Sequence, residues 1–175
     1  MNYAQLRTHD VANGPGVRVS LFVSGCTHRC PGCFNSEAWA FDYGEKFDGA
    51  VVDRIIESLA PSYIKGFSLL GGEPFEPSNQ RELAPLLERI KQNYPHKTVW
   101  CYTGYDFEKD ILTSSIGDVE TVRRMIANID VLVDGKFIME LKDLSLRFRG
   151  SSNQRIIDVP RSMRLGKAVL AEEFN

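Results

Sequence analysis

The sequence lacks long apolar runs, has only four cysteines among 175 residues, and is nearly balanced in charge. No apolar stretch approaches the roughly 18 residues of a membrane-spanning helix, and the N-terminus, with Arg7, His9 and Asp10, lacks the apolar region of a signal peptide. A formal net charge of −2 gives no global reason to expect a nucleic-acid or membrane partner. We therefore expect a cytoplasmic chain of one domain with a proper core.

Basic residues are concentrated near the C-terminus. Between Arg147 and Lys167 there are six bases and a single acid, Asp158. A solvated terminal face explains such a stretch, and so does a docking surface for an acidic partner or ligand.

Apolar periodicity predicts alternating strands and helices. Buried-strand patterns occupy 17–23, 66–70, 98–102 and 129–133. Helical spacing of apolar residues occurs at 48–59, with Asp48 as N-cap, and at 79–94, where Pro85 should kink or restart the helix. This alternation predicts an α/β fold with a parallel sheet. Since a full eight-fold barrel needs about 250 residues, we expect an open or partial β/α barrel.

Each of the four predicted strands is followed by glycine or polar residues. Because ligands bind at the carboxyl ends of parallel strands, four such loops on one rim indicate a site. Consecutive glycines also allow a ligand to approach the backbone closely, although a tight turn has the same pattern. The loops are Ser24-Gly25-Cys26, Gly71-Gly72-Glu73-Pro74, Thr103-Gly104-Tyr105 and Asp134-Gly135-Lys136.

Three of the cysteines form a C-x3-C-x2-C pattern at Cys26, Cys30 and Cys33. Thiolate triads hold zinc or iron–sulfur clusters, and three thiolates on a 4Fe-4S cluster leave one iron open to another ligand. Zinc would need His28 as a fourth ligand, in a spacing unlike the familiar paired zinc motifs. A disulfide plus a free thiol is a further alternative. Cys101, in the middle of a predicted strand, is expected to be a small core residue.

Together these residues resemble the radical S-adenosylmethionine (SAM) superfamily, whose cluster motif is C-x3-C-x2-C and whose methionine-binding motif is similar to residues 71–74. Within it, the chain resembles the family of glycyl-radical activases that act on anaerobic ribonucleoside-triphosphate reductase. This resemblance covers about residues 1–155. Many superfamily members have an aromatic residue just before the third cysteine. This chain has Gly32 at that position and its aromatic residue, Phe34, just after the cysteine, and the activase family is similar to it in this respect. The segments that carry the resemblance are 13–16, 21–35, 103–105, 133–137 and 149–154.

The resemblance implies a radical SAM type of partial parallel barrel over residues 1–155. Residues 156–175 would be a C-terminal extension, either part of the same domain or frayed. It further implies one 4Fe-4S cluster, with S-adenosyl-L-methionine bound at the open iron. Reductive cleavage would give methionine and a 5′-deoxyadenosyl radical, which would take hydrogen from a C-terminal-region glycine of the large reductase subunit. The electron would come from a donor such as flavodoxin or ferredoxin.

The resemblance also assigns roles to single residues. Cys26, Cys30 and Cys33 would hold the cluster. Gly32 and Phe34 would lie against the adenine end of the cofactor, although core packing also explains an aromatic such as Phe34. Gly71, Gly72 and Glu73 would meet the methionine amino group, with an exposed turn carboxylate as the alternative for Glu73. Asp134 and Lys136 would bind the ribose or the carboxylate, shape the entrance for the partner, or have a structural role. His9, His28 and His96 are expected at the surface.

Two other functional classes remain open from the residues. One is a small radical enzyme that acts on a free metabolite, such as a deazapurine-forming ring-contraction enzyme. The other is an electron carrier or a zinc-binding interaction module. A ferredoxin-like carrier normally closes its cluster with four cysteines, which disfavours the last class. A small chain with little material to cap a pocket favours a macromolecular substrate, because a partner can supply the missing wall.

Overall fold

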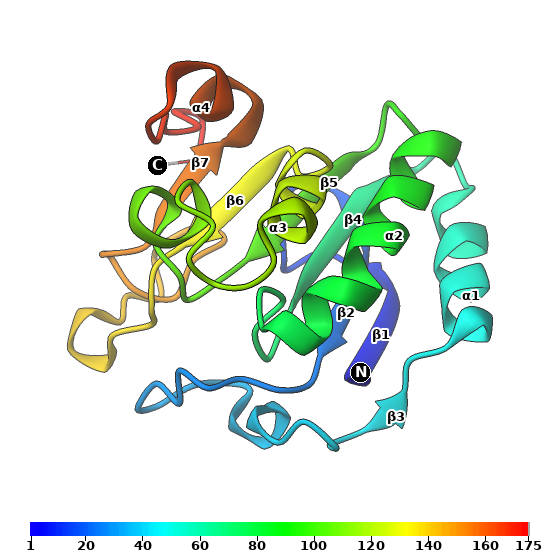
Figure 1. Ribbon diagram of the computed structural model, residues 1–175, viewed down its shortest axis with the longest axis horizontal. Helices are drawn as coiled ribbons and strands as arrows, with labels where there is room; N and C mark the ends of the chain where they lie inside the picture. The colour runs from blue at the N-terminus through cyan, green and yellow to red at the C-terminus, as the bar shows by residue number, and fades with distance from the viewer. Residues whose placement is uncertain (175) are drawn as a thin grey trace.

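The computed structural model describes residues 1–174, in which strands and helices alternate through the middle of the chain (Figure 1). Short 3-10 turns lie at Ser36–Trp39 and Met139–Leu141, and a π-helical turn, η2, lies at Phe107–Ile111. The main elements are β1 (Asn2–Asp10), β2 (Val17–Val23), β3 (Glu45–Lys46), α1 (Gly49–Leu59), β4 (Ile64–Gly71), α2 (Pro77–Asn93), β5 (Thr98–Tyr102), α3 (Val119–Ile126), β6 (Val131–Asp134), β7 (Arg155–Asp158) and α4 (Val159–Leu165).

The strands form one open, seven-stranded sheet in the order β3-β1-β2-β4-β5-β6-β7. The four central strands, β2, β4, β5 and β6, pair in parallel. The outer strands β3, β1 and β7 pair antiparallel. The predicted α/β class and the four predicted strands are confirmed, whereas β1, β3 and β7 were not predicted.

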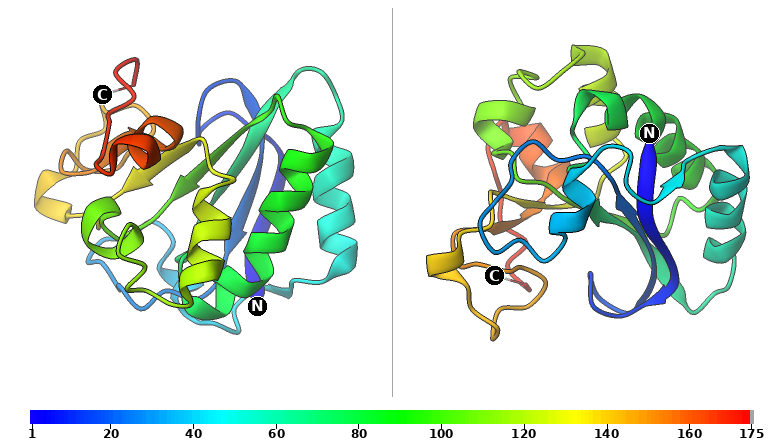
Figure 2. Two further views of the ribbon diagram at one scale, coloured as in Figure 1. Left: turned by 45° about the horizontal axis from the view of Figure 1, so that its top comes forward. Right: turned by 90° about the horizontal axis from the view of Figure 1, so that it is seen from below.

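Helices α1, α2 and α3 lie side by side on one face of the sheet (Figures 1 and 2). Asp48 caps α1 as predicted, accepting hydrogen bonds from the N–H groups of Ala50 and Val51. Helix α2 runs through Pro85 as a single element, so of the two predicted alternatives, a kink or a restart, the restart is wrong. Because Pro85 is exposed, the carbonyl of Arg81 that loses its N–H partner can bind water instead. Among residues 1–174, no helix combines the length and hydropathy needed to span a bilayer.

The opposite face of the sheet is covered by loops and by the C-terminal segment. Trp100 on β5 packs edge-on against Phe148 and Phe174, with ring centroids 5.4 and 5.1 Å apart. Near the amino ends of the strands, buried Arg18 donates hydrogen bonds to Ser68 and to the backbone of Thr98. This face therefore has a polar and aromatic lining, while the helix-covered face is apolar.

The end of the chain packs on the edge of the sheet. Ile156 and Ile157 in β7 are fully buried, and β7 pairs with β6 along its whole length. Helix α4 follows directly and ends at Gly166, which adopts the left-handed conformation of a helix C-cap.

Candidate functional site

A cavity of about 730 Å³ opens at the carboxyl ends of the parallel strands. Its volume lies within the usual range for small-molecule sites. The loops after all four central strands contribute to its lining, so the predicted rim is confirmed. The lining residues include Cys26, Cys30, Cys33, Gly71, Gly72, Glu73, Thr103, Gly104 and Gly135.

The three clustered cysteines are all free and half-buried. Burial is the main cause that raises the pKa of Cys26 to about 11; hydrogen bonds from the backbone of His28 and Arg29 oppose the shift, and the carboxylates of Glu73 and Glu76 add to it. Burial also raises the pKa of Cys30, while the backbone of Phe137 and the charge of Lys136 oppose that shift. Because thiolates rather than thiols bind metal, loading of this site releases protons.

The three thiols do not have the arrangement of ligands around a single ion. Among residues 1–174, three or more ligand atoms come within 4.8 Å of one another only at Asp106, Glu108 and Asp134. The cysteines, with or without His28, are therefore not gathered around one ion. The Nε2 atom of His28 instead lies 3.0 Å from Glu73. This arrangement disfavours the zinc alternative and suits a group with several irons, each taking one thiolate.

Two buried acids, Glu73 and Glu76, contact the segment between Cys26 and Cys30. Glu76 Oε1 accepts hydrogen bonds from the N–H of Thr27 at 2.7 Å and from its hydroxyl at 2.6 Å. The ring of His28 packs edge-on against Tyr105, and its side chain is only 7% exposed. The prediction of a surface position for His28 is therefore wrong, because Glu73 and Tyr105 draw the ring inward.

The glycine pair brings two loops close together. Gly71 has φ +111°, and a side chain there would come within 2.6 Å of the backbone of Val23. A side chain at Gly72 would come within 2.5 Å of the carbonyl oxygen of Gly25. The N–H groups of Gly72 and Glu73 bond to Val23 and Gly25. The backbone at Val23 and Gly25 and the backbone of residues 71–73 therefore lie in direct contact, which only glycine allows.

The side chain of Glu73 is engaged inside the protein and is 1% exposed. Its Oε1 accepts from the N–H of Phe75 and the hydroxyl of Thr103, and both bonds are 2.8 Å long. Its Oε2 accepts from the N–H of Gly104 at 2.7 Å and contacts His28. Glu73 is therefore a buried carboxylate that joins three loops through its contacts, and not an exposed turn carboxylate.

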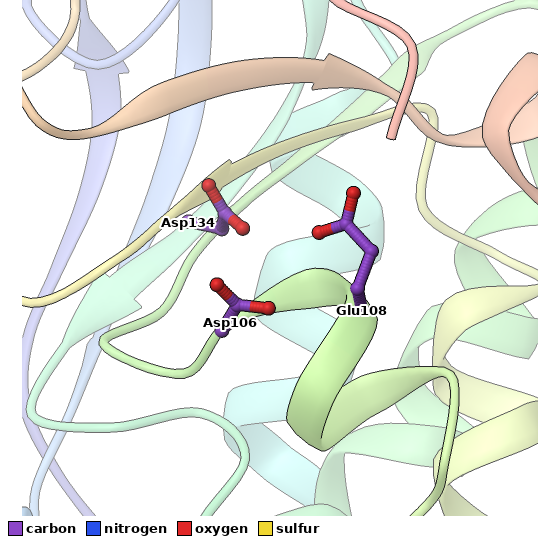
Figure 3. Close-up of side chains that lie close together, drawn as sticks. All are labelled: Asp106, Glu108 and Asp134. Atoms are coloured by element: carbon purple, nitrogen blue, oxygen red, sulfur yellow. The ribbon is translucent and has the colours of Figure 1, made fainter. Parts of the chain in front are cut away.

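Asp134 lies outside the residues that line the cavity and faces a different set of partners. Its carboxylate accepts hydrogen bonds from the guanidinium of Arg155 and from the N–H of Phe107. With Asp106 and Glu108 it forms the acidic group shown in Figure 3. These contacts favour the structural one of the roles predicted for Asp134.

Of the remaining predicted contacts, Phe34 lines the cavity, whereas Gly32 and Lys136 are sequence neighbours of lining residues. Phe34 is 69% exposed, lines the cavity, and packs beside Phe137 with ring centroids 5.9 Å apart. Gly32 has φ +71° and lies against Met139. Lys136 is exposed. The ring of Phe34 therefore remains accessible to a ligand in the cavity.

Sequence reasoning missed two buried polar residues that shape this site. Glu76 and Asn79 are 5% and 1% exposed. Asn79 Nδ2 donates to the carbonyl oxygens of Ser24 and Glu73, both at 2.9 Å. The available signal was the recurrence of polar residues at three-residue spacing, 73, 76 and 79, across the start of a predicted helix.

Comparison with known proteins identifies the family. A protein-family model described as a 4Fe-4S single cluster domain matches residues 12–157. The anaerobic ribonucleoside-triphosphate reductase-activating protein of Escherichia coli is 43% identical over 157 residues, covering 88% of this chain and 96% of that protein. Its namesake in Haemophilus influenzae is 44% identical over 158 residues, covering 89% of this chain and 97% of that protein. The chain therefore belongs to the family of anaerobic ribonucleoside-triphosphate reductase-activating proteins, with a 4Fe-4S single cluster domain.

Proposed function

We propose that this chain is a radical SAM activase that generates a glycyl radical on the large subunit of anaerobic ribonucleoside-triphosphate reductase. The observation that carries the proposal is the joint position of three free cysteines and the glycine pair on one cavity. Family membership supports the same activity. The electron donor would be a flavodoxin or a ferredoxin.

Cys26, Cys30 and Cys33 would hold the 4Fe-4S cluster. When bound, the cluster supplies the electron that cleaves S-adenosylmethionine into methionine and a 5′-deoxyadenosyl radical, which takes a hydrogen atom from the glycine. The N–H groups of Gly72 and Glu73 are already used within the protein. The glycine pair would therefore offer carbonyl oxygens to the amino group of the cofactor. Phe34 and the backbone near Gly32 would contact its adenine end.

The finer fold follows from the same reading. We propose that the four parallel strands with their flanking loops form a partial barrel of the radical SAM type. The loops and the C-terminal aromatic residues that cover the second face of the sheet support it. Residues 156–174 would belong to this same domain, because β7 completes the edge of the sheet; the last residue of the predicted extension, 175, lies outside the described residues.

The borders of the cavity support a macromolecular substrate. Three large apolar side chains stand exposed around this part of the surface, namely Phe34 at 69%, Met139 at 47% and Leu144 at 86%. Exposed apolar side chains near an open cavity are typical of a surface that a partner covers. The reductase subunit would thus supply the missing wall of the site, with Lys136 near its entrance.

Anaerobic reconstitution with iron and sulfide tests the proposal. Methionine and 5′-deoxyadenosine should appear when S-adenosylmethionine and a reductant are added together. Alanine at Cys26, Cys30 or Cys33 should abolish this release, while Cys101→Ala serves as the matched control because that thiol is fully buried away from the cavity. Addition of the reductase large subunit should then yield a glycyl doublet in electron paramagnetic resonance. One bound zinc and no iron, or turnover of a free metabolite without a doublet, would contradict the proposal.

A further inference from the structure

The cluster loop, residues 24–33, is attached to the start of helix α2 through a carboxylate that sequence analysis did not identify. Glu76 is 5% exposed, and its Oε1 accepts both donors of Thr27, which lies directly after Cys26. Both bonds are short for their type, at 2.7 and 2.6 Å. One carboxylate oxygen thus fixes the backbone and the side chain of a residue between two cluster ligands.

Glu76 occupies the N-cap position of α2, yet its side chain does not cap that helix. Its backbone carbonyl accepts from the N–H groups of Asn79 and Gln80, while the carboxylate reaches across to the cluster loop. The first helical residue is Pro77, which has no N–H to satisfy and is well suited to that position. The positive end of the helix also favours a carboxylate at this place. The helix start therefore holds Glu76 without needing its side chain as a cap.

Two further contacts hold the same stretch of loop. The carboxylate of Glu73 contacts the ring of His28 at 3.0 Å. The amide of Asn79 donates to the carbonyl of Ser24 at 2.9 Å. Residues 24, 27 and 28 are thus each bonded to the segment 73–79, so that the loop is fixed on both sides of Cys26.

The two carboxylates contact the loop through hydrogen bonds to Thr27 and through the ring of His28. Glu73 Oε2 also accepts from the N–H of Gly104, which ties this contact to the loop after β5. What Glu73 and Glu76 contribute to the site is therefore the conformation of the loop.

We propose that Glu76 is a positioning residue which, together with Glu73, holds the backbone from Cys26 to Cys30 in its ligand-binding conformation before the cluster is bound. This inference rests on the proposed function only in taking these cysteines as the cluster ligands. Residues that orient metal ligands typically change metal affinity by about 10- to 100-fold when they are removed.

Three variants separate position from charge. Glu76→Ala removes the acceptor, Glu76→Gln keeps an acceptor oxygen without the charge, and Thr27→Val removes the hydroxyl while keeping the N–H. The chain offers a matched control at the N-cap of α3, where Asp118 Oδ2 accepts both donors of Thr121 at 2.8 and 2.7 Å. Thr121→Val makes the same chemical change at the same kind of contact, away from the cavity.

Two measurements on the full chain read the effect. Amide hydrogen exchange in the cluster-free protein should show a protected Thr27 N–H that loses at least about tenfold protection in Glu76→Ala and keeps it in Glu76→Gln. Iron release from the reconstituted protein to a chelator should accelerate about tenfold or more in Glu76→Ala. The rate should rise by a smaller factor in Thr27→Val and stay near that of the wild type in Glu76→Gln and Thr121→Val.

The outcomes distinguish this inference from the proposed function. Equal iron release from Glu76→Ala and the wild type would overturn the inference alone, and so would equally fast release from Glu76→Gln and Glu76→Ala, which would assign the effect to charge. If Glu76→Ala does not fold, a Thr27→Val rate equal to that of Thr121→Val overturns it. A wild-type chain that takes up no iron overturns the proposed function and this inference with it.

Discussion

Two groups of acidic residues lie beyond the carboxyl ends of the parallel strands, and they are held in opposite ways. Glu73 and Glu76 follow β4, and their bonds come from backbone N–H groups, threonine hydroxyls and His28. Asp106 and Glu108 follow β5, Asp134 is the last residue of β6, and the guanidinium of Arg155 lies among all three. In the first group Glu73 lines the cavity, while the second group holds β7 to its neighbours.

The difference shows how the setting of a carboxylate decides its use. The three oxygens of the second group lie close enough for a cation, as Figure 3 shows, but Arg155 already supplies the positive charge. Its bidentate contact with Asp134 raises the pKa of Arg155, so the guanidinium stays charged. In the first group, mostly neutral donors fix both oxygens of Glu73 and Oε1 of Glu76 in place. The neutral donors hold the cluster loop in position, whereas the guanidinium of Arg155 holds the edge strand β7 to the rest of the sheet.

The largest expected effect comes from removing the guanidinium. Arg155→Ala leaves Asp134, which is 1% exposed, without its cation and beside two further carboxylates. Breaking a buried ion pair costs about 3–5 kcal/mol in the free energy of unfolding. Because Arg155 is partly exposed, we expect a loss of about 3 kcal/mol, at the low end of this range. Urea denaturation of the cluster-free protein would measure this change in the free energy of unfolding.

A lysine at the same position separates charge from geometry. Arg155→Lys keeps one positive charge but cannot make the paired contact of the guanidinium with Asp134. It should recover only part of the lost free energy. A full recovery would show that charge alone matters here, and an unchanged stability of Arg155→Ala would remove the contrast between the two acidic groups.

A smaller effect should come from glycines that flank the two groups. A side chain at Gly104 would come within 2.5 Å of the His28 ring, whereas the nearest atom to one at Gly135 is 3.7 Å away. Gly104→Ala should therefore lower the free energy of unfolding by about 1–3 kcal/mol through overpacking. It should also accelerate iron release, because the added methyl group would push the His28 ring away from Glu73. Gly135 has φ +94°, so Gly135→Ala should cost about 1–2 kcal/mol in backbone strain.

Iron release to a chelator and urea denaturation, measured on both variants, give the comparison. Both glycines follow the carboxyl end of a parallel strand, Gly104 after β5 and Gly135 after β6, so each serves as the control for the other. Release that accelerates equally in both variants would show that the His28 contact has no special part in holding the cluster loop.

The sequence predicted the centre of the sheet well and its edges poorly. The strand 98–102 was predicted to the residue, because its β-branched and aromatic residues are buried on both faces of a parallel sheet. Strand β1 escaped notice, since polar residues alternate along it and its burial is incomplete. Strand β7 has only four residues and depends on pairing with β6. Tertiary pairing, and not local pattern, creates these edges.

The site shows the same difference between features that the local sequence pattern predicts and features that depend on tertiary contacts. The cysteine spacing and the strand-end glycines were visible in the sequence, and Cys101 was correctly predicted as a core residue. The bonds of Thr27 and His28 to segment 73–79 could not be predicted, because they join residues 49 and 45 positions apart. Such contacts depend on how the loops after β2 and β4 fold against each other. The sequence pattern does not indicate which residues of the two loops come together.

The smallest expected effect concerns pH and again separates the two groups. Burial alone would raise the pKa of Glu108, but hydrogen bonds from Arg155 and from the N–H of Ala168 lower it below the ordinary value of 4.5. A carboxyl with a lowered pKa in the folded state stabilises the fold above its unfolded pKa, and that stability is lost as the pH falls through the folded value. Urea denaturation between about pH 3 and 6 should therefore show a shallower pH dependence for Glu108→Gln than for the wild type. The difference should shrink in an Arg155→Lys background, because the guanidinium that lowers the pKa is gone. An equal difference in both backgrounds would assign the shift to Ala168 and leave Arg155 as a lock for Asp134 alone.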